Sequence, residues 1–188
     1  MPGLSERDKM LSGALYDATD AALVAARHRA TAVLQRYNAL PPTDLAGRTA
    51  TLRALLGHVG ERVEVVPPFQ VDYGGQIWLG DGVFLNFGCV ILDTVAVRIG
   101  AGTLVGPNVQ VYAATHPVDP ALRRAGLELG APVTVGKNVW IGGGTILLAG
   151  VTVGDDSVIG AGSVVTRDVP AGVVAVGNPC RVLRPVTV

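Results

Sequence analysis

The chain has 188 residues, of which 49% are hydrophobic and 16% are charged, with 15 basic and 15 acidic side chains. Zero net charge provides no overall field that would attract nucleic acid or an anionic membrane, and glycines interrupt each apolar stretch before it reaches the ~20 residues of a membrane-spanning helix. A length of 188 residues suits one domain with a small appendage. Because soluble domains usually carry about 25% charged residues, we expect this chain to cover part of its apolar surface in an oligomer.

The N-terminus and the cysteines favour a cytoplasmic protein. The first residues, MPGLSERDKMLSGALYD, lack the apolar core of a signal peptide. Cys89 and Cys180 have neither metal-binding nor redox spacing. We therefore expect both to be small buried hydrophobic side chains in a reducing compartment.

The first third of the chain carries a helical pattern. Ser5 is suited to cap a first helix that ends near Tyr16, and Asp20 a second helix, AALVAARHRATAVLQRYN. A third short helix is expected before the chain reaches the extended segment VEVVPPFQVDYG. We expect a helical segment over 1–60 and a different architecture over 61–188.

That second architecture shows itself as an aliphatic residue at every sixth position. Neither a helix, with a period of 3.6, nor a strand, with a period of 2, explains this spacing. Twelve positions follow it, in four groups of three: Leu79, Leu85, Ile91; Ile99, Val105, Val111; Val135, Ile141, Leu147; and Val153, Ile159, Val165. A unit of three hexads, eighteen residues, predicts one coil with three flat faces.

The breaks in the period predict where loops leave the coil. Two extra residues follow Ile91 and eighteen follow Val111, each after the third position of a group. Gly or Asn follows every first and second position, as tight corners require. The pattern therefore predicts a mainly β protein, a parallel β-helix with coils about 4.8 Å apart, from which a loop over about 113–132 is extruded.

The repeat resembles that of the hexapeptide-repeat acyltransferases. The segments LYDATDAALVAAR, PPFQVDYG, LNFGCVILD, ATHPVDP, VGKNVWIGGG, VIGAGSVV and GNPCRV together resemble the maltose and galactoside O-acetyltransferase family. This resemblance implies a left-handed, triangular β-helix, a homotrimer with active sites between neighbouring prisms, and acetyl transfer from acetyl-CoA to a sugar hydroxyl without a metal.

His116 is the candidate catalytic base. It is the only histidine of the β-helix region and lies where the long insertion leaves the coil. A lone loop histidine is more often solvated or structural, but an imidazole is the usual base for activating a hydroxyl at neutral pH. The resemblance aligns His116 with the catalytic base of the family.

A second set of candidates would bind the acetyl group and the pantetheine arm. Asn86 fills a corner position otherwise held by Gly, and the resemblance makes it a contact of both substrate and acetyl group. Gly143 and Ala161 lie eighteen residues apart and should stack, leaving a shallow groove; the resemblance assigns this groove to coenzyme A and the Gly143 N–H to the oxyanion. Trp140 is expected either to line the same cleft or to pack at a trimer interface.

Late in the chain, four residues are candidates for the nucleotide end of coenzyme A. Isolated arginines are usually solvated, but the guanidinium fork suits phosphate. The resemblance places Thr166, Arg167, Arg181 and Arg184 there.

Carboxylates are the candidates for binding the acceptor, because they accept hydrogen bonds from sugar hydroxyls. By resemblance, Asp17 and Asp72 match acceptor-site positions and Arg27 matches a further one. Asp93 is either an acceptor contact or a residue that bonds its own turn. Glu128 could reach the acceptor from the extruded loop.

Three other functions compete with sugar acetylation. Antibiotic acetyltransferases of the streptogramin or chloramphenicol type share the hexads and a loop histidine, without the LYDATD-type lead. A metal hydratase on the same prism would need three zinc-binding histidines, whereas this region has one. A non-catalytic β-helix scaffold would not need His116.

Overall fold

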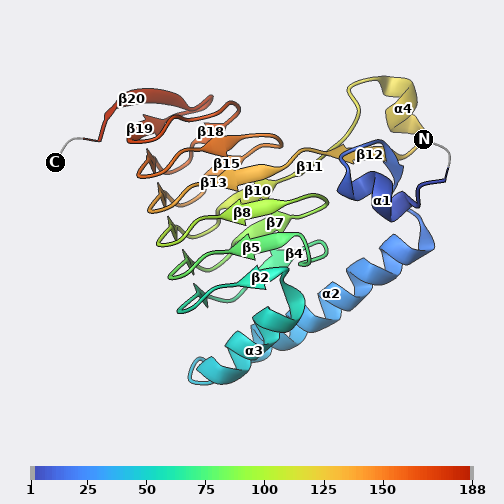
Figure 1. The fold of residues 1–188 in the computed structure, drawn as a ribbon, viewed down its shortest axis with the longest axis horizontal. Helices are drawn as coiled ribbons and strands as arrows, with labels where there is room; N and C mark the ends of the chain where they lie inside the picture. Colours follow the sequence, from blue (N-terminus) through green and yellow to red (C-terminus); the bar gives the residue numbers. More distant parts are fainter. Residues whose placement is uncertain (1–2, 187–188) are drawn as a thin grey trace.

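The hexads build a triangular prism of short parallel strands, with helices along one side and the base (Figure 1). The computed structural model describes residues 3–186. No helix in this described part is both long and apolar enough to cross a membrane.

Three sheets form the faces of the prism, named here in the order in which each coil visits them. The first face holds β2 (His58–Val59), β5 (Ile77–Leu79), β8 (Val97–Ile99), β13 (Val133–Val135) and β16 (Thr152–Val153). The second face holds β3 (Glu64–Val65), β6 (Phe84–Leu85), β9 (Leu104–Val105), β14 (Trp140–Ile141), β17 (Val158–Ile159), β19 (Val173–Val176) and β20 (Arg181–Pro185). The third face holds β4 (Gln70–Val71), β7 (Val90–Leu92), β10 (Gln110–Tyr112), β15 (Ile146–Leu147) and β18 (Val164–Val165).

The core of the prism consists of the aliphatic positions that the period predicted. All twelve are 3% exposed or less. Strands one coil apart pair in parallel. The offset is eighteen residues where no insertion intervenes, as between Ile141 and Ile159, and it grows to 20 and 36 residues across the two insertions, as from Leu79 to Ile99 and from Ile99 to Val135. The mainly β, parallel β-helix is therefore confirmed.

The structure extends the prism beyond the pattern at both ends, with a partial coil after it, in which Val169 pairs with Val153 and Ala175 with Ile159, and a full coil before it. Val59, Val65 and Val71 keep the six-residue spacing and lie in β2, β3 and β4, where the sequence was interpreted as helical segment and extended lead-in. The corner after Val59 is turned by Arg62 at φ 53°. Gly60 follows Val59 as the pattern requires, but Val66 follows Val65 where Gly or Asn is expected, so this coil does not match the pattern in full.

The glycines at the corners have a different role from the one expected. The left-handed residue comes third after the aliphatic position, as at Gly82 and Gly144. The glycine directly after that position is needed for stacking instead: a Cβ on Gly142 would lie 2.5 Å from the Ala161 nitrogen of the next coil. Close approach of backbones, and not a positive φ, selects glycine there.

Four helices complete the chain in the described residues: α1 (Glu6–Leu11), α2 (Ala21–Ala39), α3 (Leu45–Leu55) and α4 (Pro120–Arg124). Ser5 and Asp20 cap the first two as predicted. The first helix ends earlier than expected, because Gly13 takes a φ of 75°. The long helix α2 is fixed to the prism by Tyr37, whose hydroxyl donates to the Val65 carbonyl at 2.5 Å.

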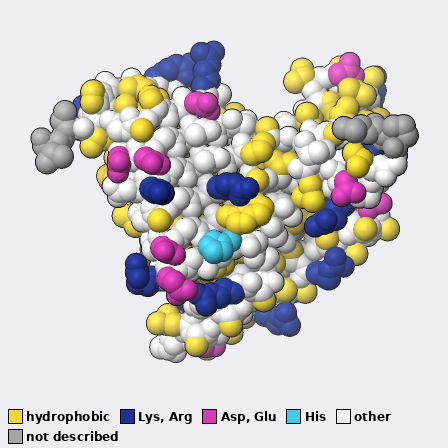
Figure 2. Space-filling view, viewed as in Figure 1, with side chains coloured by type: hydrophobic (Ala, Val, Ile, Leu, Met, Phe, Trp, Pro, Cys, Tyr) yellow, Lys and Arg dark blue, Asp and Glu magenta, His cyan; other side chains and the backbone are white. Residues whose placement is uncertain are grey.

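The long insertion folds into an arm that stands away from the prism. We use "arm" for β11 (Ala114–Thr115), α4 and β12 (Leu127–Gly130), together with β1 (Tyr16–Asp17) and α1, which join it from the N-terminal end of the chain (Figure 1). The three strands form one antiparallel sheet in the order β1-β12-β11. A notch separates the arm from the end of the prism (Figure 2).

Candidate active site

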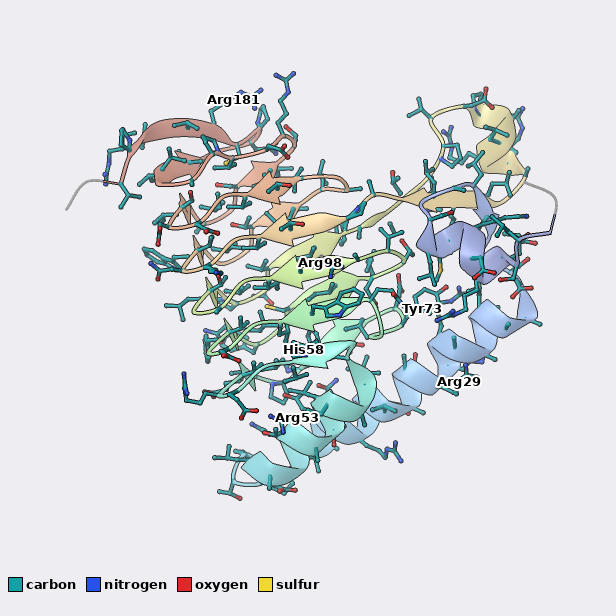
Figure 3. All side chains as sticks on the ribbon, in the orientation of Figure 1. Arg29, Arg53, His58, Tyr73, Arg98 and Arg181 are labelled. Atoms are coloured by element: carbon teal, nitrogen blue, oxygen red, sulfur yellow. The ribbon has the colours of Figure 1, made fainter. Side chains whose placement is uncertain are left out.

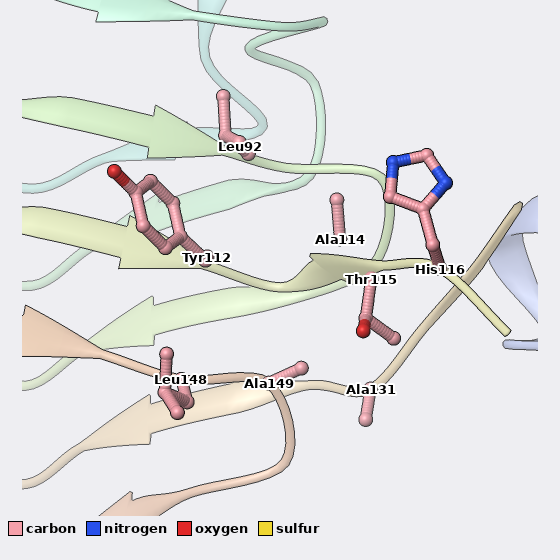
Figure 4. Close-up of a pocket in the computed structure, with 8 residues that line it drawn as sticks. All are labelled: Leu92, Tyr112, Ala114, Thr115, His116, Ala131, Leu148 and Ala149. Atoms are coloured by element: carbon pink, nitrogen blue, oxygen red, sulfur yellow. The ribbon is translucent and has the colours of Figure 1, made fainter. Parts of the chain in front are cut away.

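His116 lies at a cleft where the arm leaves the prism. The cleft has a volume of about 590 Å³ and lies at the third corner, between the third and first faces. Its wall is mostly apolar, and Figure 4 shows His116 at its outer end. The lining residues are Leu92, Tyr112, Ala114, Thr115, His116, Ala131, Leu148 and Ala149.

The His116 side chain is exposed and available for reaction. The residue follows β11 directly, and Pro117 after it cannot donate to a sheet ladder, so the chain turns away into the arm. No hydrogen bond from the imidazole to another group occurs within residues 3–186. A side chain held this way can meet a substrate hydroxyl in the cleft.

The candidate acceptor residues gather beside the same corner. Asp17 is exposed in β1, and its carboxylate accepts from the Thr19 N–H at 2.8 Å and hydroxyl at 2.6 Å. These hydrogen bonds lower the pKa of Asp17. Arg27 reaches across from α2 and donates to the Tyr73 hydroxyl at 2.7 Å. Tyr73 lies between the prism and α2 (Figure 3).

Asp72 lies next to Tyr73 in the turn after β4 and is partly buried. Burial raises the pKa of Asp72, the Arg27 charge opposes this, and the Glu128 charge adds to it. The residues that the sequence nominated from three distant segments therefore form one electrostatic cluster.

Asp93, by contrast, serves the turn and does not face the cleft. Its side chain is 0% exposed, and its two oxygens accept from the Tyr73 N–H at 2.9 Å and the Gln76 N–H at 3.1 Å. Of the two roles that the sequence left open, this geometry supports the turn and corrects the expectation of an acceptor contact. Through Tyr73, Asp93 holds the turn that carries Asp72.

Burial raises the pKa of Asp93 to about 6, and the backbone hydrogen bonds offset only part of that effect. The folded protein thus holds this proton more tightly than the unfolded chain does. We expect the contribution of Asp93 to the free energy of unfolding to fall by about 3 kcal/mol as the pH rises through this window, from 3.8 to about 6.

Urea unfolding of the protein and of Asp93→Asn across this pH range measures the effect. The stability of the unmodified protein relative to the variant should decline as the pH rises. A difference that stays constant with pH would contradict this account of Asp93.

A second hollow lies at the second corner, between the second and third faces. It is a groove of about 500 Å³ whose lining includes Asn86, Trp140, Gly143 and Ala161. The pairing of β14 with β17 stacks Gly143 under Ala161, as predicted. No acceptor within the described part of the chain takes the N–H of Gly143 or of Ala161. Both donors are therefore free to meet a ligand in the groove.

The rim of this groove is unusually apolar for a surface. Among its lining residues, Trp140 is 58% exposed and Leu104 51%. Phe87, which follows the lining residue Asn86, is 49% exposed. Exposed aromatic and aliphatic side chains beside a groove mark a surface that another molecule covers. Both expected roles of Trp140, cleft lining and interface, are compatible with this position.

The four candidates for binding the nucleotide end of coenzyme A do not lie together: two are at the third corner and two are on the side of the groove at the second corner. Thr166 and Arg167 follow β18 and lie exposed at the third corner, on the side of His116. Arg181 pairs with Val176, which stacks over Gly160 at the upper end of the groove. Arg184 pairs with Val174, farther from the groove.

The two hollows do not meet within one chain. Among the described residues, none lines both, and the width of the third face separates the two corners. His116 and the acceptor cluster lie at one corner, whereas Asn86, Gly143 and Ala161 lie at the other. Residues 3–186 also hold no cluster of His, Cys, Asp and Glu suited to a metal ion.

Sequence reasoning missed Tyr16 and Tyr73, the side chains that organise the acceptor cluster. Tyr16 is 1% exposed and donates to Glu128 Oε2 at 2.8 Å. Its partner lies 112 positions away, so no local pattern could have revealed the pair. The only signal was the presence of Tyr16 in the LYDATD segment.

Two family profiles match the chain. Residues 9–60 match the maltose acetyltransferase hexapeptide capping motif, and residues 132–167 match the bacterial transferase hexapeptide with six repeats. The first profile spans α2 and α3, and the second spans the upper coils.

Similar proteins extend over nearly the full length. Nodulation protein L of Rhizobium meliloti is 51% identical over 95% of this chain and 97% of its own. The crystal structure of a maltose O-acetyltransferase from Clostridium difficile is 44% identical, with a TM-score of 0.96 over 98% of this chain and 99% of its own. A galactoside acetyltransferase in complex with coenzyme A is 37% identical, with a TM-score of 0.94 over 98% and 92%.

Proposed function

Since the chain belongs to the maltose and galactoside O-acetyltransferase family of hexapeptide-repeat enzymes, we propose that it transfers the acetyl group of acetyl-CoA to a hydroxyl of a sugar. Coenzyme A is the ligand of the similar galactoside acetyltransferase structure. The groove at the second corner fits its pantetheine arm, because small residues there expose free N–H donors.

His116 is the general base of this reaction. It takes the proton from the acceptor hydroxyl while the hydroxyl oxygen attacks the thioester carbon. The tetrahedral intermediate then collapses, the C–S bond breaks, and His116 returns the proton to the coenzyme A sulfur. An exposed imidazole at the mouth of a mostly apolar cleft is the observation that supports this role.

Transfer is direct, without an acyl-enzyme. Cys89 is 2% exposed, and burial raises its pKa to about 11. Cys180 is 8% exposed, and burial raises its pKa as well. Because the thiolate is the reactive form of cysteine, neither residue is suited to attack acetyl-CoA.

Gly143 and Asn86 stabilise the oxyanion of the intermediate. A backbone N–H without another acceptor is pre-organised for developing negative charge, so no protein reorganisation is needed at the moment of reaction. The Asn86 side chain accepts from the Phe87 N–H at 2.8 Å, which orients its amide NH₂ as a second donor.

The complete site forms between two copies of the chain. His116 and the groove lie at different corners of one prism, so a single chain cannot present both to one acetyl group. A ring of three copies would bring the third corner of one prism to the second corner of the next. The apolar rim of Trp140, Leu104 and Phe87 would be covered in such a trimer.

A thiol-release assay with acetyl-CoA and a panel of acceptors tests the proposed function. Release that depends on maltose, glucose or a galactoside is the expected result. Release that depends only on a streptogramin or chloramphenicol would overturn the sugar assignment. Absence of coenzyme A binding would overturn the transferase function and favour a scaffold.

A further inference from the structure

One row across the sheet of the arm contains Tyr16, Glu128 and His116. The register of β1 with β12 places Tyr16 opposite Glu128. The register of β11 with β12 pairs Thr115 with Leu129. The next pair along this antiparallel register is His116 with Glu128, at the point where β11 ends.

Residues of one row project from the same side of a sheet, with Cβ atoms about 5 Å apart. Figure 4 shows Ala114 and His116 on one side of the strand and Thr115 on the other. Ala114 pairs with Gly130, two residues from Glu128. The imidazole and the Glu128 carboxylate therefore leave the sheet on the same side.

The carboxylate is held from the opposite side by Tyr16. The Tyr16 hydroxyl donates to Glu128 Oε2 at 2.8 Å, and burial is the main cause that raises the Tyr16 pKa, so the hydroxyl remains a donor. Glu128 Oε1 accepts from no group in the described chain. One oxygen is thus anchored while the other is free.

The charges around this row are few. Asp72 and Tyr73 approach Glu128 from the prism, and Arg27 approaches both of them from α2. No salt bridge of the described chain involves Glu128. Its negative charge is therefore available to a cation that forms beside it.

We propose that Glu128 is a positioning residue for His116, whose imidazole N–H donates to the free carboxylate oxygen while Tyr16 holds the other. This inference rests on the proposed role of His116 as the base. No hydrogen bond joins the two side chains in the described contacts; catalytic hydrogen bonds commonly tighten only when substrates are in place. The carboxylate then fixes the ring and stabilises the imidazolium that forms when His116 takes the proton.

The test is the pH–rate profile of Glu128→Gln, which keeps an acceptor for Tyr16 but removes the charge. We expect kcat to fall by about tenfold or more, with little change in the KM for the acceptor. The acidic limb of the kcat profile should move to lower pH by about one unit, because an adjacent carboxylate favours the imidazolium. Tyr16→Phe should change both quantities in the same direction by less.

Tyr37→Phe is the matched control. Tyr37 is also buried and donates one hydroxyl hydrogen bond, but it lies against α3 and the first coil. The Tyr37→Phe substitution should lower the stability of the protein and leave the pH dependence of kcat unchanged. An increase of the acceptor KM alone in Glu128→Gln would make Glu128 an acceptor contact and overturn the proposal, as would an unchanged profile. Activity retained in His116→Ala would instead overturn the base assignment itself.

Discussion

Replacing His116 with Ala is expected to lower kcat by about 10²–10⁴-fold, the usual contribution of a general base. The variant retains the groove at the second corner, so it should bind acetyl-CoA with unchanged affinity. Thiol release with a sugar acceptor measures the first effect, and isothermal titration with acetyl-CoA measures the second. Together they separate a loss of chemistry from a loss of binding.

His58→Ala is the control for this experiment. His58 is exposed in β2 on the first face and lines neither hollow. It should retain full activity. A His116→Ala variant with more than a few per cent of the original kcat would refute the assignment of the base.

Replacing Ala161 with Trp is expected to weaken acetyl-CoA binding by at least about 100-fold, or about 2.7 kcal/mol. Ala161 is exposed in the groove, directly above Gly143, so an indole would fill the space assigned to the pantetheine arm. The fold should tolerate the change because the side chain points away from the core. Isothermal titration measures the affinity and thermal unfolding measures the stability.

Ala171→Trp provides a matched control on the same prism. A Cβ on Gly154 would lie 2.4 Å from the Ala171 nitrogen, just as one on Gly142 would lie 2.5 Å from the Ala161 nitrogen. Ala171 therefore occupies the equivalent corner position, but at the first corner. It should bind acetyl-CoA normally. Equal affinity in the two variants would mean that the groove is not the coenzyme A site.

The prism was predictable from the sequence because its period is local. Each aliphatic position is buried by residues of its own coil and the next, so eighteen residues reveal the whole repeat. The first coil escaped notice because Val66 follows Val65, its second aliphatic position, where the other coils have Gly or Asn. The glycines after first and second aliphatic positions were found, but their cause, the close approach of the next coil, is visible only in three dimensions.

The site was predictable only in part. The sequence nominated His116 and Glu128 from the extruded loop and Asp72 from a distant segment, and the structure brings the three to one corner. The row of Tyr16, Glu128 and His116 depends on the register of the arm, which no local pattern encodes. The burial of Asp93 likewise depends on the turn that closes over it.

The hexad phase implies that His116 and Gly143 lie at different corners. Gly143 comes after the second position of a group, Ile141, and His116 lies in the insertion after a third position, Val111, so the third face separates them. This separation is the reason for placing the active site between copies, and it can be tested without knowing the physiological acceptor.

In the most direct test, the His116→Ala variant and the Ala161→Trp variant are refolded together in equal amounts. Each variant alone should be inactive, but in mixed trimers an intact His116 corner can meet an intact groove on the neighbouring copy. Random assembly should place the two together at about one quarter of the sites. Recovery of roughly that fraction of the original thiol-release activity is the expected result. A mixture as inactive as its components would contradict a site shared between copies.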